Sequence, residues 1–365
     1  MKQVFGFLLL ALAAGATAQN RQIIFEHDLS PQLLAQAKQQ NKLVFVDCYT
    51  VWCGPCQGMA KTVFTQDSVA DFFNTKFVNV KLDMEKEGKD KMEKYKIGAF
   101  PSFLLLDGDG HLLYKFVGGM SSGEFMARIR EGINPKNKVA VYNQLYAEGN
   151  RSKDFLREYI KLKINMMETK EGKQIAADYF DMLTPEERTQ PENWYLFGDN
   201  RYTLYLSDYY TRNAGYLADN WRAFAAVKGK DTVEARLTQI FRKIANYSLE
   251  GYYFKQLAYN PADFNRYRRQ VRSTELADKD QLMVLMDVAE AAGQKDTAKV
   301  TTLLIQHIGG LSADNQKIFL AYMHLVGFSA RRFPQAVEVA EQVIKVSKNE
   351  SIIQLAKSLQ KTAHS

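Results

Sequence analysis

The chain has 365 residues, of which 46% are hydrophobic, and a formal net charge of +7 at neutral pH. That length suffices for two domains of ordinary size. The basic residues are spread along the chain without a long run, which favours solubility and does not indicate nucleic-acid binding. The only three cysteines lie between positions 48 and 56, so the chain is not a scaffold held together by many disulfides.

The first 18 residues have the pattern of a secretory signal peptide. Lys2 supplies a positive charge, residues 5–14 are apolar, and Ala16-Thr17-Ala18 has the small-residue spacing of a cleavage site. The apolar stretch is too short for a convincing membrane span, and retention as an uncleaved anchor is the alternative. We expect export to the periplasm with cleavage after Ala18.

Residues 19–132 are expected to form one α/β domain, because strand-like and helix-like stretches alternate from residue 22 onward. Ser30-Pro31 is a typical helix start, and Asp107-Gly108-Asp109-Gly110 is a hairpin signal. Ser121 opens a closing helix that is expected to stop near Gly132. Strands are expected at residues 23–25, 43–47, 77–83, 102–106 and 111–117.

The sequence Trp52-Cys53-Gly54-Pro55-Cys56 lies between the apolar strand at 43–47 and a helix whose apolar residues recur at helical spacing. This places Cys53 at the helix N-terminus, where unpaired amide groups and the helix dipole stabilise a thiolate. The thiolate is the nucleophile in disulfide exchange. We expect Cys53 to be an exposed attacking thiol and Cys56 the resolving thiol, with Gly54 and Pro55 keeping the loop tight.

Two other uses of the cysteine pair are less favourable. A purely structural disulfide would close a loop too short to constrain much of the unfolded chain. A zinc site lacks a second cysteine pair or a nearby histidine to complete four ligands. The sequence therefore predicts redox chemistry, with no metal and no cofactor.

The surroundings of the motif resemble those of thioredoxin-fold proteins across residues 22–132. Trp-Cys-Gly-Pro-Cys is the active-site sequence of thioredoxins. Asp47, six residues before the first cysteine, matches their buried acid, and Lys81 matches the lysine that accompanies it. Pro101 matches the cis-proline opposite the cysteines, and Gly118-Gly119 matches the glycine after the last strand.

The resemblance is strongest to periplasmic thioredoxin-like domains, such as the soluble C-terminal domain of the transmembrane thiol:disulfide interchange reductase. It implies reduction of protein disulfides and a membrane-bound electron donor. Two departures leave substrate choice and redox potential open. Phe100 precedes Pro101, as in eukaryotic-type isomerase domains, and Cys48 replaces an aromatic residue usually found beside the acid.

Roles for the remaining site residues follow from position and from the resemblance. Asp47 ends an apolar strand, so desolvation would favour its protonated form, unless it is simply an exposed strand-end carboxylate. The resemblance implies that Asp47 relays a proton for Cys56 with Lys81 tuning it, and that Pro101 offers backbone groups to substrate. Trp52 either shields the cysteine pair or packs ordinarily. Cys48, on the opposite face of the strand, is expected to be an inert buried thiol.

Residues 133–137 are predicted to be a linker, and residues 138–365 an all-α domain, because helical spacing replaces strand-like alternation. The end of the chain faintly resembles tetratricopeptide packing through Gly327, Phe333, Ala336 and Ala340, but no clean repeat is found, so an irregular solenoid is the alternative. The aromatic-rich segment from Trp194 to Phe224 either binds peptides or packs helices together.

Together these features predict an exported thiol–disulfide oxidoreductase that reduces protein disulfides, with a helical domain that recruits a protein partner or substrates. A disulfide isomerase, suggested by Phe100-Pro101, is one alternative. A helical scaffold or binding protein with a secondary redox domain is the other.

Overall fold

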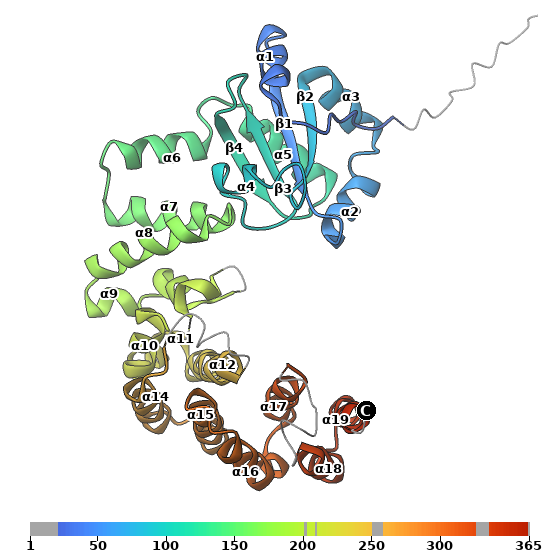
Figure 1. Ribbon diagram of the computed structural model, residues 1–365. Coiled ribbons are helices and arrows are strands. Elements are labelled where there is room, and N and C mark those ends of the chain that lie inside the picture. Colours follow the sequence, from blue (N-terminus) through green and yellow to red (C-terminus); the bar gives the residue numbers. More distant parts are fainter. Residues whose placement is uncertain (1–20, 201–202, 209, 250–257, 326–335, 364–365) are drawn as a thin grey trace, which may run out of the picture. The chain divides into compact units, whose positions relative to one another are not determined.

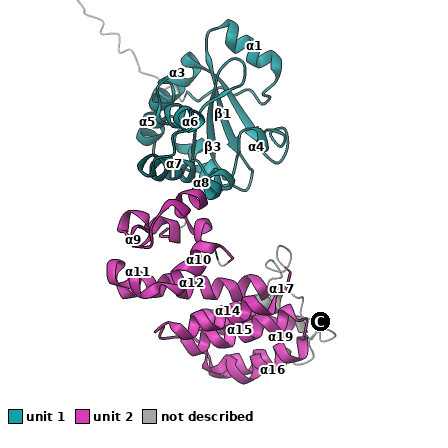
Figure 2. Cartoon of the chain, turned by 90° about the vertical axis from the view of Figure 1, so that its left-hand side faces the viewer, with its two compact units in different colours: residues 1–175 teal, residues 176–365 magenta. Residues whose placement is uncertain are grey.

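The computed structural model describes residues 21–200, 203–208, 210–249, 258–325 and 336–363. The chain divides into two compact units between Ile175 and Ala176 (Figure 2). The predicted signal peptide lies outside the described residues. Within the described ranges, every helix is too short or too polar to cross a membrane.

The first unit contains a mixed four-stranded sheet with strand order β2-β1-β3-β4 (Figure 1). β1 runs parallel to β2 and antiparallel to β3, and β4 is antiparallel to β3. β1 is therefore paired on both edges, which explains its almost unbroken run of apolar residues. The strands are β1 (Leu43–Tyr49), β2 (Phe77–Asp83), β3 (Ser102–Leu106) and β4 (Leu112–Val117).

Helices cover both faces of this sheet (Figure 1). Phe45 and Phe103 point to one face, where they pack with residues of α2, α3 and α5. Val46 and Leu104 point to the other face, which α1 and α4 cover. The helices of the first unit are α1 (Pro31–Gln39), α2 (Gly54–Thr62), α3 (Asp67–Lys76), α4 (Lys91–Lys94), α5 (Ser122–Gly132), α6 (Lys138–Ala147), α7 (Lys153–Asn165) and the start of α8 (Thr169–Met182).

The predicted strand at residues 23–25 is wrong. Residues 23–25 pair with no strand, and an isolated parallel bridge follows them, between Glu26 and Val80. The Ile23 amide donates to the Phe64 carbonyl at 3.1 Å, the Ile24 amide donates to Asn74 at 2.9 Å, and Asn79 donates to the Ile24 carbonyl at 3.4 Å. The segment is thus tied to the sheet edge without extending the ladder.

The chain becomes helical where the sequence predicted, but the division between compact units falls later. Asn137 caps α6 by accepting a hydrogen bond from the Ala140 amide. Val139 and Met166 belong to the apolar core beside the sheet, which is why α6, α7 and the first turns of α8 form part of the first unit. The expected linker at 133–137 therefore does not separate the two units.

The described part of the second unit is all helical, which confirms the predicted fold class. α12 packs against α11 and α15, α15 against α14 and α16, and α18 against α19. Its elements are the remainder of α8, α9 (Pro185–Thr189), η1 (Pro191–Phe197), η2 (Leu204–Ser207), α10 (Arg212–Asp219), α11 (Trp221–Lys228), α12 (Lys230–Leu249), α14 (Pro261–Ser273), α15 (Lys279–Gly293), α16 (Thr297–His307), η3 (Ile308–Gly310), α17 (Ala313–Leu325), α18 (Ala336–Val346) and α19 (Glu350–Ala363).

Most of the described aromatic residues between Trp194 and Phe224 pack inside the second unit. Trp194, Phe197 and Phe224 are buried and form a cluster of ring contacts. This supports the packing interpretation of the segment. Of the residues that carried the tetratricopeptide resemblance, Gly327 and Phe333 lie outside the described residues, and Ala336 and Ala340 lie in α18.

Candidate active site

The cysteine pair sits at the N-terminus of α2, as the sequence predicted. Cys53 is the N-cap residue and is bonded to Cys56, with the two Cα atoms 5.3 Å apart. The Cys56 amide donates a hydrogen bond to the Cys53 sulfur at 3.2 Å. An amide donor and a helix N-terminus both favour negative charge on that sulfur, so the geometry suits a Cys53 thiolate.

The expectation of an exposed Cys53 is wrong for the disulfide form. Cys53 is only 4% exposed and Cys56 6%, whereas the neighbouring Trp52 is 66% exposed. The Cys53 sulfur is turned toward the helix because it is bonded to Cys56 and accepts the amide of that residue. Only a small part of the Cys53 side chain is therefore open to a reductant in the disulfide form.

Asp47 is buried, with an exposed fraction of 2%. It is paired with Lys81 across the parallel β1 and β2 strands, and the Lys81 Nζ lies 3.7 Å from Asp47 Oδ2. Burial raises the pKa of Asp47 to about 6, and Lys81 opposes this rise. A carboxyl group with such a pKa exchanges a proton near neutral pH. The alternative of an exposed strand-end carboxylate is excluded.

Lys81 contacts two aromatic rings, and neither ring was singled out from the sequence. The Lys81 Nζ lies 4.7 Å from the centroid of the Tyr49 ring and 5.7 Å from that of Phe25. Cation–π contacts of this kind stabilise an ammonium group beside its carboxylate. The position of Tyr49, two residues after Asp47 on the same face of β1, was the available signal.

Pro101 lies in a loop that is tied to the cysteine loop through two glycines. The Phe100–Pro101 peptide bond is cis, as the resemblance implied. The Gly118 amide donates to the Pro101 carbonyl at 2.9 Å. A Cβ atom on Gly119 would lie 3.0 Å from the Pro55 Cβ, so this backbone packs directly against the cysteine loop.

Trp52 bridges the cysteine loop to the residues around Pro101 from the solvent side. Its Nε1 donates to Glu85 Oε1 at 3.0 Å, and its ring makes an edge contact with Phe100, centroids 6.0 Å apart. Ordinary core packing is therefore excluded. Glu85 was missed by the sequence analysis, although it follows β2 at the edge where the parallel strands β1 and β2 both end.

Cys48 lies on the sheet face opposite Asp47, among the apolar residues beneath α1 and α4. It is a free thiol with an exposed fraction of 1%. Burial, followed by the charge of Asp47, raises the pKa of the Cys48 thiol well above its ordinary value. This thiol stays protonated at neutral pH and is therefore unreactive, as expected.

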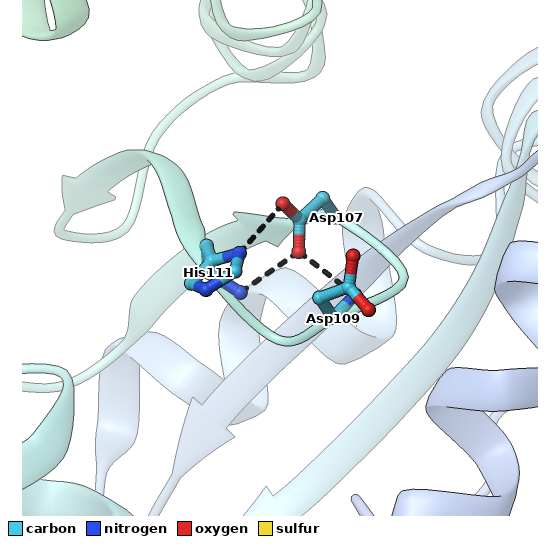
Figure 3. Close-up of side chains that lie close together, drawn as sticks. All are labelled: Asp107, Asp109 and His111. Carbon is cyan, nitrogen blue, oxygen red and sulfur yellow. Dashed lines mark hydrogen bonds and ion pairs between the residues drawn. The ribbon is translucent and has the colours of Figure 1, made fainter.

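Three potential metal-ligating residues, Asp107, Asp109 and His111, cluster in the hairpin turn between β3 and β4 (Figure 3). Asp107 Oδ1 accepts hydrogen bonds from the Asp109 and His111 amides, both at 2.9 Å, and the His111 ring lies 3.0 Å from Asp107. Lys38 lies 2.7 Å from the Asp109 carboxylate. These bonds build the predicted hairpin turn and account for the cluster.

The sheet, the dithiol at a helix N-terminus and the adjoining cis-proline loop define a thioredoxin-like thiol–disulfide oxidoreductase domain. A family model described as a thioredoxin-like domain matches residues 31–133. Thioredoxin H-type of Fagopyrum esculentum is 31% identical over 103 residues, covering 28% of this chain and 84% of that protein. The chain belongs to the thioredoxin family.

Two further comparisons cover the same region. Thioredoxin Y1 of Arabidopsis thaliana, a chloroplastic protein, is 35% identical over 96 residues, or 26% of this chain. The chain spans 53% of that relative and 56% of thioredoxin Y2, about half of each. A solved structure described as a candidate disulphide-isomerase from Bacteroides thetaiotaomicron is 41% identical, with 32% of this chain and 98% of that chain covered and a TM-score of 0.30.

Proposed function

We propose that the chain is an exported thiol–disulfide oxidoreductase that reduces protein disulfides in the periplasm. The observation that carries this proposal is the hydrogen bond that the Cys56 amide donates to the Cys53 sulfur at the start of α2. That contact favours a reactive thiolate in the reduced protein. The buried Asp47, with a pKa of about 6, supplies a proton acceptor on the strand that leads to the cysteines.

The reaction proceeds in two exchanges. The Cys53 thiolate attacks one sulfur of the substrate disulfide, whose S–S bond breaks to leave a mixed disulfide and one substrate thiolate. Cys56 then loses its proton to the Asp47 carboxylate and attacks the Cys53 sulfur. The substrate leaves as a dithiol, and the protein ends as the Cys53–Cys56 disulfide, having given up two electrons.

The two residues between the cysteines, Gly54 and Pro55, support electron flow from this protein to its substrates. An oxidant needs a strongly stabilised thiolate, which makes its disulfide easy to reduce. Gly54 and Pro55 offer no cationic or imidazole group, so the helix terminus and its amides stabilise the Cys53 thiolate only moderately. A reductant in an oxidising compartment needs resupply, and a membrane-bound electron donor fills that role.

The export and partner parts of the proposal depend on other features. Lys2, the apolar residues 5–14 and Ala16-Thr17-Ala18 support secretion. Nothing in the dithiol chemistry requires the helices of residues 176–365, which supports a separate role for them in recruiting a protein partner or substrate. A helical scaffold with a secondary redox domain would show partner binding but weak disulfide reduction.

Equilibrating the purified protein against glutathione buffers tests the direction. We expect a reduction potential near that of reducing thioredoxins, about −270 mV. A value near the oxidising range, about −120 mV, would overturn the reductase assignment and favour an oxidase or isomerase. Refolding of a scrambled disulfide protein separates those two, because an isomerase accelerates it and an oxidase does not.

A further inference from the structure

Lys115 is a buried lysine of the sheet that contacts the segment leading to Pro101. Lys115, in β4, has a side chain that is 0% exposed. All three hydrogen-bond donors of its ammonium group are used. Lys115 Nζ donates to the Tyr95 carbonyl at 3.1 Å and to the Lys96 carbonyl at 2.9 Å, and lies 2.8 Å from Glu168 Oε1.

The carboxylate that balances this charge comes from beyond the thioredoxin-like segment. The family match ends at residue 133, whereas Glu168 lies in the turn between α7 and α8. The second oxygen of Glu168 accepts a hydrogen bond from Lys163 at 2.7 Å. Glu171 lies 3.1 Å from Lys163 and 2.7 Å from Lys96. The ion pairs thus continue from α8 back to the segment that precedes Pro101.

The same turn also touches that segment through the backbone. A Cβ atom on Gly98 would lie 2.6 Å from the Met167 carbonyl oxygen, closer than atoms normally approach. Residues 96–98 and 167–171 also line a groove of about 810 Å³. Two contacts therefore hold the start of the segment between Lys96 and Pro101. Lys115 donates to the Tyr95 and Lys96 carbonyls, and the α7–α8 turn packs against Gly98.

We propose that Glu168, acting through Lys115, is a positioning residue that fixes the Lys96–Pro101 segment for protein substrates. This inference depends on the proposed function, because the segment acts on substrate only if the dithiol reduces protein disulfides. An extended substrate pairs with backbone groups of such a loop by strand addition. Small displacements of those groups weaken the pairing, whereas exchange at the Cys53 sulfur does not depend on them.

The test compares a protein substrate with a small one in the full chain. Insulin presents a polypeptide backbone, and dithionitrobenzoate presents a disulfide without one. For Glu168→Gln we expect KM for insulin to rise roughly ten- to a hundredfold, the range a misplaced binding group can produce. The rate with dithionitrobenzoate and the reduction potential should stay at wild-type values.

Two further variants separate positioning from loss of stability. The double variant Lys115→Met/Glu168→Met removes the Lys115–Glu168 ion pair, and Lys163 keeps Glu171 at 3.1 Å. Less stability is therefore lost than when Lys115 stays buried without its carboxylate, while the hydrogen bonds to the Tyr95 and Lys96 carbonyls remain absent. We expect the double variant to have a higher thermal stability than Glu168→Gln and a KM for insulin that remains high. Gly98→Ala should raise the same KM from the other side of the contact, because its new methyl group collides with the Met167 carbonyl.

The matched control is Glu158→Gln, which removes a carboxylate from α7 that pairs with Lys161 on the same helix at 2.9 Å. It should leave all three measurements unchanged. An unchanged insulin KM in Glu168→Gln, or a return to the wild-type KM in the double variant, would overturn the inference. Wild-type protein that fails to reduce insulin at all would instead remove the proposed function.

Discussion

The Cys53 sulfur and the Cys56 amide define the chemistry at the scale of single residues. The amide donates to that sulfur at 3.2 Å, whereas Cys48 lies on the other sheet face and is shielded from solvent. The surroundings of Cys53 therefore favour its thiolate, whereas those of Cys48 keep its thiol unreactive. The sequence located the helix start that places Cys53 as its N-cap, and the attacking and resolving roles of Cys53 and Cys56 stay predictions.

Replacing the resolving cysteine should trap substrates. In Cys56→Ser, the mixed disulfide through Cys53 forms but has no internal thiol to release it. We expect covalent adducts in cell extracts on non-reducing gels, identified by mass spectrometry. The matched variants are Cys53→Ser, which should trap nothing, and Cys48→Ala, which should behave as wild type. Adducts through Cys48 would contradict the assignment.

The raised pKa of Asp47 makes the stability of the protein depend on pH. In the folded protein this pKa is about 6, against 3.8 for an ordinary aspartate. The folded state therefore binds the proton more tightly, and the associated stability is present below about pH 4 and lost as pH rises through 6. Asp47→Asn removes the cost of the buried charge, which two pKa units place at up to about 3 kcal/mol.

Urea unfolding at two pH values measures this effect. At pH 8 Asp47→Asn should be more stable than wild type, and at pH 3.5 the two should be equal. The variant should also reduce insulin more slowly, because Cys56 loses its proton acceptor. A stability difference that is the same at both pH values would show that Asp47 does not titrate between them.

At the scale of elements, α5 ends at Gly132, as the sequence predicted. Gly132 is the last helical residue and Ile133 is the C-cap, so the glycine lies inside the helix end and not beyond it. Gly132 is buried, and a Cβ atom there would lie 2.6 Å from the Tyr114 ring and 2.7 Å from Leu105 Cδ1. Its small size therefore serves close packing of α5 on the sheet.

This packing predicts a difference between two glycines of the same helix. Gly132→Ala should destabilise the protein by about 1–3 kcal/mol, the usual cost of overpacking. Gly123→Ala has open space around the new methyl group and should stabilise by up to about 1 kcal/mol through helix propensity. Denaturant midpoints of the two variants check this. Equal effects would contradict the packing account.

At the scale of the whole molecule, the strands that carry the site residues could be predicted from the sequence, but the extent of the first compact unit could not. The strands that carry Asp47 and Lys81 could be located because each is marked by a pattern of apolar residues within one short stretch of sequence. Lys115 lies between Tyr114 and Phe116 in β4, and this alternation is typical of a strand with one face toward solvent. The structure covers that face as well, with a carboxylate from a distant turn. Such pairings depend on tertiary contacts, which periodicity does not record.

This pairing predicts that the thioredoxin-like segment is not self-sufficient. A fragment of residues 21–137 deprives Lys115 of the Glu168 carboxylate, and in the full chain burial lowers the pKa of Lys115. Removing one partner of a buried ion pair costs about 3–5 kcal/mol. We expect a fragment of residues 21–183, which retains α6 to α8, to unfold cooperatively in urea, and the shorter fragment to be less stable by at least that amount.

A single substitution distinguishes the ion pair from the apolar contacts that the shorter fragment also loses. Lys115→Met in residues 21–137 removes the unpaired ammonium and should recover much of the lost stability. In residues 21–183 the same substitution leaves Glu168 with Lys163 at 2.7 Å, so its effect should be small or opposite. If Lys115→Met fails to stabilise the short fragment, the dependence of the redox domain on its helical extension rests on Val139 and Met166 in the shared core instead.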